Sequence, residues 1–351
     1  MHSLKKSSTR VFLYFGLLTV FLFQTSANAS DTLNRILARG DVRCGVSDGI
    51  PGFSMKAPDG RWSGMDVDFC RALAAAVLGN PEKVSFVSLT SAARFPSLKA
   101  GEIDVLVRNT TWTMEREVGL EVMFAGILYY DGQSFLVPAK SDVRDISRLN
   151  GATICAVKGS THEKNLSDHF RFQNWNYQPL IVESQAKAAE ALFEDRCQAF
   201  TSERAQLTAV QLKAPGGPEQ YVILPEQPKD SLAKDPMGPV VRSGDDKWFT
   251  VVRWVLFSLI KAEETGITQS NVKSTLTAGE DARVHRWNEV EGTISRTLGL
   301  QTGWAVRLIE ASGNYGEMFE RNLGSRSALK LERGLNRLYT QGGLMYSPPF
   351  R

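Results

Sequence analysis

The stretch of residues 98–117, LKAGEIDVLVRNTTWTMERE, constrains the fold of this chain more than any other. Ile103–Val107 is short and rich in β-branched residues, which is typical of a buried strand. Polar residues follow at once from Arg108 to Thr111, and Thr113 then stands where a capping residue precedes a helix. A strand, a polar strand end and a helix start in this order indicate an α/β fold with candidate site residues beyond the strand.

Arg116 lies three residues after Thr113, at the position that holds Glu or Gln in a capping box. An arginine in the first helical turn is unfavourable against the helix dipole, whereas an anion there is favourable. The guanidinium matches the two oxygens of a carboxylate, and Asn109, Thr110 and Thr111 supply amide and hydroxyl groups nearby. We therefore predict that Arg116 binds a carboxylate ligand. The alternative is a surface arginine paired with a neighbouring glutamate.

Residues 1–29 have the pattern of a secretory signal peptide. Three basic residues precede the apolar run Val11–Phe23, and Ala27–Ala29 gives a small-x-small cleavage site. The apolar run is too short for a comfortable membrane span, so we expect an exported protein. Without the three basic residues the formal net charge of +3 becomes zero, and no general affinity for nucleic acid is expected.

The four cysteines fit an oxidising compartment and allow three pairings. Cys44 and Cys70 lie near the start and Cys155 and Cys197 lie mid-chain, so in a two-lobed protein each lobe would hold one bridge. None of the spacings is that of a Cys-x-x-Cys metal or redox site, so structural disulfides or buried thiols are expected. The four histidines show no paired spacing, and we predict no metal and no cofactor.

Helices and strands alternate in the first part of the chain, which predicts a mostly parallel sheet with helices on both faces. The expected elements are a helix over 31–39, a strand over 42–46, a helix ending before Gly79, a strand over 84–89, a helix over 91–99 and the strand over 103–107. A second cycle begins after 129–132, with strands over 133–137 and 152–157 and helices over 184–194 and after 203.

A second polar strand end follows residues 152–157. Ser160, Thr161 and His162 open a helix there, and this arrangement supplies hydroxyls and backbone amides. Glu203 follows a short strand that ends at Phe200, and it is either an ordinary first-turn acid or a carboxylate that holds a cation. His162 is either merely exposed or at the rim of a pocket. A ligand that carries both a carboxylate and an ammonium group would complement a guanidinium on one side of a site and a carboxylate on the other.

The motif GMDVDFCRALA at residues 64–74 resembles the Gly-aromatic-Asp-Val-Asp signature of family 3 solute-binding proteins, which serve amino-acid ABC transporters. The motifs NTTWTMERE, GPVVRSGDDKWF and GNYGEMFERN are most similar to those of the general L-amino acid binders. The resemblance implies a type II periplasmic-binding-protein fold, with two lobes joined by a two-strand hinge. It also implies a periplasmic location, free L-amino acids as ligands and membrane permease subunits as partners.

The resemblance assigns roles to individual residues. Arg116 matches the arginine that pairs with the ligand α-carboxylate, and Asn109 and Thr111 match residues that bond the ligand from the same lobe. Thr161 matches a carboxylate donor of the second lobe. Glu203 replaces the aspartate that usually holds the α-ammonium, so its longer side chain is a departure from the family.

The walls of the pocket are expected to be small. Ile50 and Ser91 stand where specific relatives carry aromatic residues, which predicts a wider cavity and broad specificity. Ser160 and His162 are further ligand-binding candidates. We expect a monomer that is not an enzyme. The alternatives are an amino-acid sensor and a cyclohexadienyl dehydratase-like enzyme in which Glu203 and His162 serve as acid and base.

The predicted domain organisation is lobe 1 over 30–132, lobe 2 over 133–235 and a return to lobe 1 over 236–351. The crossings are expected near 129–132 and near 234–239. In the second crossing, Pro236, Gly238 and Pro239 would break regular structure. After a long amphipathic helix over 246–264, an extension should cap lobe 1. It is predicted to hold helices over 303–309, 315–321 and 327–343, followed by an extended tail.

Overall fold

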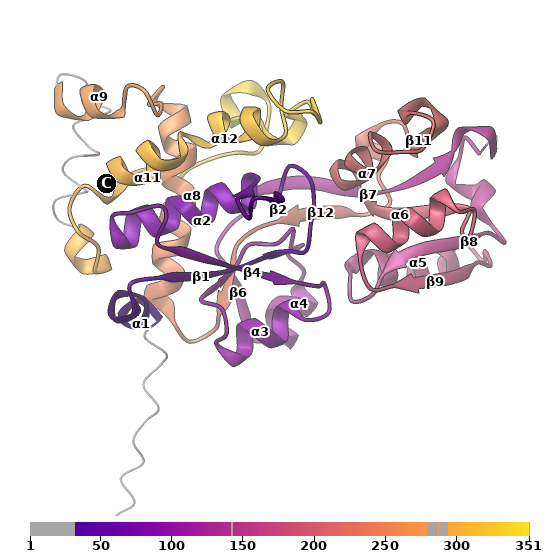
Figure 1. Ribbon diagram of the computed structural model, residues 1–351, viewed down its shortest axis with the longest axis horizontal. Coiled ribbons are helices and arrows are strands. Elements are labelled where there is room, and N and C mark those ends of the chain that lie inside the picture. Colours follow the sequence, from indigo (N-terminus) through magenta and orange to yellow (C-terminus); the bar gives the residue numbers. More distant parts are fainter. Residues whose placement is uncertain (1–31, 142, 279–286, 288–293, 351) are drawn as a thin grey trace, which may run out of the picture.

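The computed structural model describes residues 32–141, 143–278, 287 and 294–350, so the predicted signal peptide lies outside the described residues. Two lobes are visible in Figure 1, each built around one sheet, and two paired strands run between them. This arrangement confirms the predicted two-lobed α/β class.

The sheet of lobe 1 has the strand order β4-β1-β5-β13-β6. Its strands are β1 (Val42–Ser47), β4 (Val84–Leu89), β5 (Val105–Leu106), β6 (Val122–Phe124) and β13 (Val240–Arg242). A separate small hairpin consists of β2 (Met55–Lys56) and β3 (Trp62–Ser63). Strand β1 is parallel to β4 and β5, whereas β13 is antiparallel to β5 and β6. The last part of the chain therefore inserts a strand between elements formed by the first part.

The helices of lobe 1 agree closely with the sequence prediction. They are α1 (Thr32–Arg39), α2 (Met65–Leu78), α3 (Arg94–Ala100), α4 (Met114–Gly119) and α8 (Asp246–Glu264). Helix α2 ends at Gly79, whose φ of 71° is the left-handed conformation that glycine adopts readily. Helix α3 begins later than predicted, because the Thr90 hydroxyl accepts from the Ala93 amide and forms a turn before the helix.

Lobe 2 has the strand order β11-β7-β10-β8-β9. Its strands are β7 (Tyr129–Pro138), β8 (Thr153–Val157), β9 (Gln178–Val182), β10 (Ala199–Glu203) and β11 (Tyr221–Leu224). Its helices are α5 (Thr161–Phe172), α6 (Gln185–Phe193) and α7 (Arg204–Gln211), and short 3₁₀ turns lie at η1 (Ala139–Ser141), η2 (Ile146–Leu149), η3 (Pro218–Gln220) and η4 (Pro228–Asp230). Strand β10 continues past the predicted end at Phe200, because Glu203 still pairs with Gln133 on β7.

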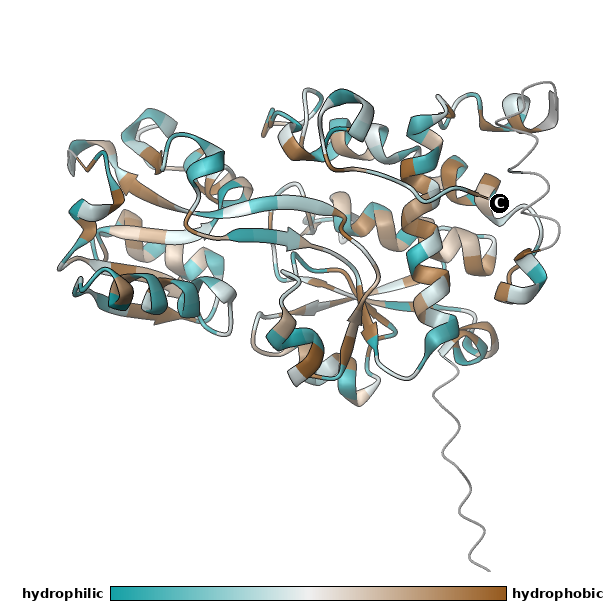
Figure 2. Ribbon diagram, turned by 180° about the vertical axis from the view of Figure 1, so that it is seen from behind, coloured by the Kyte–Doolittle hydropathy of each residue, from teal (hydrophilic) through white to brown (hydrophobic). Residues whose placement is uncertain are grey.

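The two crossings lie side by side. Strand β12 (Lys234–Met237) pairs antiparallel with the first residues of β7, from Lys234 opposite Gly132 to Met237 opposite Tyr129. These hinge strands are largely hydrophilic between the lobes, whereas the strands inside the lobes carry apolar residues (Figure 2). The expectation that Pro236 breaks regular structure is wrong. Proline is tolerated in β12 because it lacks only the backbone N–H. Its carbonyl still accepts from the Trp112 amide at 2.7 Å, next to the isolated bridge between Met237 and Thr111.

The C-terminal extension is part of the core of lobe 1. It contains α9 (Val272–Ala278), α11 (Trp304–Ser312) and α12 (Tyr315–Asn322), and α11 packs along α2 (Figure 1). Trp304, Tyr315 and Phe319 are buried in the same apolar cluster as Phe69 of α2.

The predicted helix over 327–343 is wrong. The segment forms only the 3₁₀ turns η5 (Gly334–Asn336) and η6 (Tyr339–Gln341). Its polar side chains bond to distant parts of lobe 1: Arg333 pairs with Glu263, and the Asn336 amide bonds to the backbone of Tyr130. These contacts replace the local hydrogen bonds of a helix.

Both expected disulfides are present. Cys44 joins Cys70 across β1 and α2, and Cys155 joins Cys197 across β8 and the start of the β10 segment. Each lobe is therefore cross-linked within itself. Among the described helices, none is long and apolar enough to cross a membrane.

Candidate ligand-binding cleft

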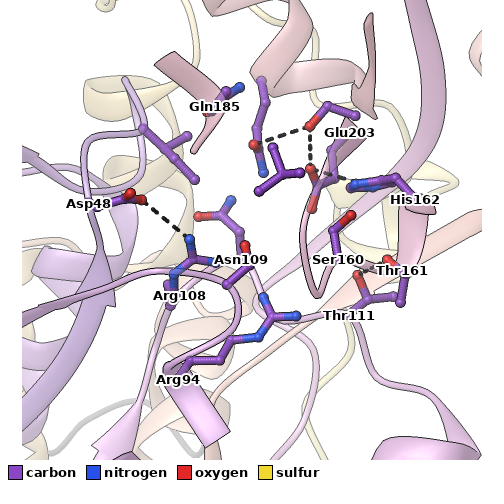
Figure 3. A pocket seen from close by; sticks show the side chains of 15 residues that line it. Asp48, Arg94, Arg108, Asn109, Thr111, Ser160, Thr161, His162, Gln185 and Glu203 are labelled. Atoms are coloured by element: carbon purple, nitrogen blue, oxygen red, sulfur yellow. Dashed lines mark hydrogen bonds and ion pairs between the residues drawn. The ribbon is translucent and has the colours of Figure 1, made fainter. Parts of the chain in front are cut away.

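A cleft of about 410 Å³, including its open mouth, lies where the two lobes face each other. Lobe 1 lines it with Asp48, Ile50, Ser91, Arg94, Arg108, Asn109 and Thr111, and lobe 2 lines it with Val157, Ser160, Thr161, His162, Gln185, Ser202, Glu203 and Gln206. Figure 3 shows how these side chains converge from both lobes.

Lobe 1 brings buried cations to the cleft. The Arg108 Nε donates to the Leu89 carbonyl at 2.7 Å, and its Nη2 lies 3.4 Å from Asp48 Oδ1. Arg94, at the start of α3, is 2% exposed and reaches the Gly159 carbonyl of lobe 2 at 3.4 Å. Burial lowers the pKa of both guanidinium groups. Because arginine stays protonated in proteins, this side of the cleft favours an anion.

Asn109 projects an unpaired amide into the same space. Its backbone has a φ of 40°, which places it at the sharp turn after β5. The side-chain oxygen and nitrogen are both buried, and neither has a hydrogen-bond partner among the described residues. Buried polar atoms of this kind cost free energy until a partner pairs with them. A polar ligand in the cleft would provide that partner.

Two predicted site residues lie behind the cleft wall rather than on it. The Arg116 amide donates to the Thr113 side chain, which confirms the predicted helix cap, and Arg116 Nη1 donates to the Thr111 carbonyl at 2.8 Å. Burial lowers the pKa of Arg116 to about 10, against the opposing effect of Asp235 and Glu203. Thr110 is fully buried, and its hydroxyl donates to the Arg108 carbonyl. A direct ligand contact of Arg116 or Thr110 stays a prediction.

Lobe 2 brings a buried carboxylate. Glu203 ends β10, is 5% exposed and makes no capping hydrogen bond to α7. The Ser202 hydroxyl donates to Glu203 Oε2 at 2.9 Å, and His162 Nε2 lies 3.5 Å from the same oxygen. This position favours the cation-holding interpretation over that of an ordinary first-turn acid. Ser160 caps α5 by accepting from the Glu163 amide, so Thr161 and His162 are the first residues of that helix.

Asp235 completes the charged network and was missed by sequence analysis. It is fully buried on β12, and it accepts from the Thr111 hydroxyl at 3.0 Å and the Thr161 hydroxyl at 3.5 Å. His162 Nε2 lies 3.3 Å from Asp235 Oδ2. Burial lowers the pKa of His162, but Glu203 and Asp235 outweigh it and raise the pKa above its ordinary value. Asp235 therefore links residues of both lobes at the hinge.

Most predicted site residues are brought together. Asn109, Thr111, Ser91, Ser160, Thr161, His162 and Glu203 all line the cleft, as does the expected wall residue Ile50. Sequence analysis missed Asp48, Arg94, Arg108, Val157, Gln185, Ser202 and Gln206. Asp48 and Arg108 offered a signal, since each follows a predicted strand by one or two residues. In the described part of the chain, no group of three or more potential ligand residues is placed to hold a metal ion.

Two lobes joined by paired strands, with cations on one wall of the cleft and a carboxylate on the other, define a protein that captures a small charged ligand. Residues 42–270 match the family of bacterial extracellular solute-binding proteins, family 3. This chain belongs to that family.

Relatives and a solved structure extend over nearly the whole chain. The general L-amino acid-binding periplasmic protein AapJ of Rhizobium johnstonii is 42% identical over 93% of this chain and 94% of its own length. The putative amino-acid ABC transporter-binding protein YhdW of Escherichia coli K12 is also 42% identical, with the same coverage. The structure of a periplasmic binding protein from Brucella ovis with glutathione bound has a TM-score of 0.86 and 43% identity. It covers 92% of this chain and 100% of the other.

Proposed function

We propose that this chain is the substrate-binding component of an ABC importer and that it captures free L-amino acids between its lobes. The observation that carries the proposal is the charge division of the cleft: buried guanidinium groups from lobe 1 face the buried carboxylate of Glu203 from lobe 2. The names of AapJ, a general L-amino acid-binding periplasmic protein, and of YhdW, a putative amino-acid ABC transporter-binding protein, support the same class of ligand.

In the proposed complex the α-carboxylate lies against lobe 1 and the α-ammonium against lobe 2. Arg116 supplies the guanidinium for the carboxylate, while Asn109, Thr111 and Thr161 complete its hydrogen bonds. Arg94 and Arg108 add positive potential at the same wall. Glu203 accepts from the ammonium, and its contact with Ser202 holds the carboxylate in place.

Ligand capture then drives closure. A ligand that bonds both lobes has a higher affinity for the closed state and shifts the population toward it. Expulsion of water strengthens the charged contacts further, because the local dielectric falls. Small walls at Ile50 and Ser91 leave room for different side chains, so recognition rests on the shared zwitterion.

The location and partners follow from the same proposal. The chain works as a monomer in the periplasm, and permease subunits in the membrane recognise its closed form. An enzyme or a sensor with this fold is not favoured, since the relatives named above are named as binding proteins.

Titration calorimetry of the whole mature chain with charge-deleted ligands tests the proposal. We expect L-glutamine to bind, while N-acetyl-L-glutamine and L-glutamine methyl ester each bind roughly 100-fold more weakly, because each lacks one charged end. Equal affinity for all three compounds would contradict capture through the zwitterion. The panel of twenty free amino acids, measured by thermal shift, then ranks the side chains.

A further inference from the structure

A second hollow adjoins the amino-acid cleft and is not used by the proposed zwitterion contacts. Its empty space is about 900 Å³ including the open mouth. It lies between the first loop of lobe 1 and helices α6 and α7 of lobe 2, and its walls include Pro51, Ala186, Ala189, Phe193 and Val210. These walls are mostly apolar, in contrast to the charged cleft.

Gln185 connects the two spaces, because it lines both of them. Its side-chain oxygen and nitrogen are buried, and within the described residues neither has a hydrogen-bond partner. A primary amide both donates and accepts, so its natural complement is another amide group. Gln185 therefore marks the place where a ligand that runs from the cleft into the hollow gains an amide contact.

The charged residues that line the hollow are two acids, Glu190 and Glu194, and one base, Lys213. Glu190 is paired with Lys187 at 2.8 Å, and the Glu194 carboxylate bonds to Arg196 at 2.8 Å. Both carboxylates therefore already form ion pairs with basic side chains. Lys213 also lines the hollow and adds an exposed ammonium group. A carboxylate at the outer end of a ligand would complement it.

We propose that this hollow is a subsite for an apolar group joined through an amide to the side chain of the captured amino acid. The ligand class is the γ-glutamyl dipeptides with an apolar second residue. The glutamyl end keeps its free α-ammonium and α-carboxylate for the cleft, so the inference rests on the proposed function. The γ-amide meets Gln185, the apolar side chain packs on Phe193 and Val210, and the terminal carboxylate faces Lys213.

Calorimetry with three ligands and two variants tests this subsite in the whole mature chain. The ligands are γ-L-glutamyl-L-leucine, L-glutamine and the isomer α-L-glutamyl-L-leucine, whose α-carboxylate is consumed by the peptide bond. Ala186→Phe fills the hollow from an exposed position on α6. Ala100→Phe is the matched control, since it adds the same ring at an exposed position on α3 that lines neither space.

We expect the wild-type chain to bind the γ-linked dipeptide and L-glutamine, and to bind the α-linked isomer at least about tenfold more weakly. Ala186→Phe should weaken the γ-linked dipeptide by about tenfold or more, with L-glutamine changed less than about twofold. Ala100→Phe should change neither. The inference is overturned if L-glutamine binds and the γ-linked dipeptide does not, or if Ala186→Phe affects both ligands equally. Failure of L-glutamine and every other free amino acid to bind would instead overturn the proposed function.

Discussion

The two walls of the cleft hold their charges in different ways. On lobe 1, the Leu89 carbonyl accepts from Arg108, whose guanidinium also lies 3.4 Å from the Asp48 carboxylate, and behind the wall the Thr111 carbonyl accepts from Arg116. On lobe 2, the Glu203 carboxylate is held by side chains, those of Ser202 and His162. Arginine cannot lose its proton, whereas histidine titrates near neutral pH. The comparison indicates that the positive charges of lobe 1 are fixed, whereas the charge balance of lobe 2 depends on pH.

The cores differ as well. The main apolar cluster of lobe 1 includes residues from the first strands, from α8 and from the C-terminal extension. Lobe 2 has two smaller clusters on the two faces of its sheet. A small core depends more on covalent cross-links, because it buries less apolar surface.

Removing the disulfide of lobe 2 should have the largest effect. The double variant Cys155→Ser with Cys197→Ser opens a loop with a sequence separation of 42 residues. The loop-entropy model predicts a loss of about 4 kcal/mol of unfolding free energy, measured by urea denaturation. The Cys44→Ser and Cys70→Ser pair, with a separation of 26, should lose slightly less. Wild-type stability in both double variants would contradict a stabilising role for these bridges.

The substitution Glu203→Gln should have the next largest effect. It should weaken the binding of free amino acids by about 3 kcal/mol, because the buried charge partner of the ammonium is lost. N-acetylated ligands lack this contact, so their affinity should differ little between the variant and the wild type. Calorimetry of both ligand types measures the difference. Glu183→Gln, at an exposed acid of lobe 2 that pairs with Lys158, is the control and should bind like the wild type. Equal losses for both ligand types in Glu203→Gln would count against the ammonium assignment.

Arg116→Ala should weaken the binding of all amino acids by a similar amount, roughly 2 kcal/mol, which is the scale of a hydrogen bond to a charged group. The same measurement on several side-chain classes checks this common loss. A selective loss for one class would show that Arg116 acts on the side chain rather than on the α-carboxylate.

The pH dependence of binding sharpens the contrast between the walls. In the free protein the pKa of His162 is raised above 6.5 by Glu203 and Asp235, after the opposing effect of burial. An α-ammonium at Glu203 opposes protonation of His162, so binding releases a proton from the imidazolium. Ligand affinity should therefore be highest at pH values above this raised pKa. It should fall as the pH decreases through the pKa, by up to about tenfold per pH unit. Calorimetry across this range should show a flat profile for His162→Gln, and an unchanged slope would contradict the coupling.

The smallest effect is expected at an exposed ion pair between the two lobes. Lys164 of α5 bonds to Glu115 of α4 at 2.5 Å, and both side chains are exposed. Solvent screens such a pair, so Lys164→Ala should weaken ligand affinity by no more than about threefold. Lys158→Ala breaks a comparable pair within lobe 2 and is the control. A large loss in Lys164→Ala would show that this bridge contributes to closure.

Much of the architecture was predictable from local patterns. The helix over 246–264, the cap at Thr113 and the helix end at Gly79 were predicted because periodicity, capping and glycine conformation involve residues close together in the chain. The polar strand ends at Asn109 and Thr161 were predicted in the same way, from the polar residues that directly follow an apolar strand. The sequence by itself therefore determined the alternating elements, the two lobes and most of the residues that meet in the cleft.

Only the tertiary structure decided the rest. Thr111 and Asp235 are 124 positions apart, yet they are hydrogen-bonded at the hinge. Arg94 lay inside a predicted helix with no local sign that it would reach lobe 2. The segment 327–343 has a sequence suited to a helix, but Arg333 and Asn336 find partners in lobe 1 instead. Buried polar groups take whichever partners the packed chain brings near, and sequence neighbours carry no information about those partners.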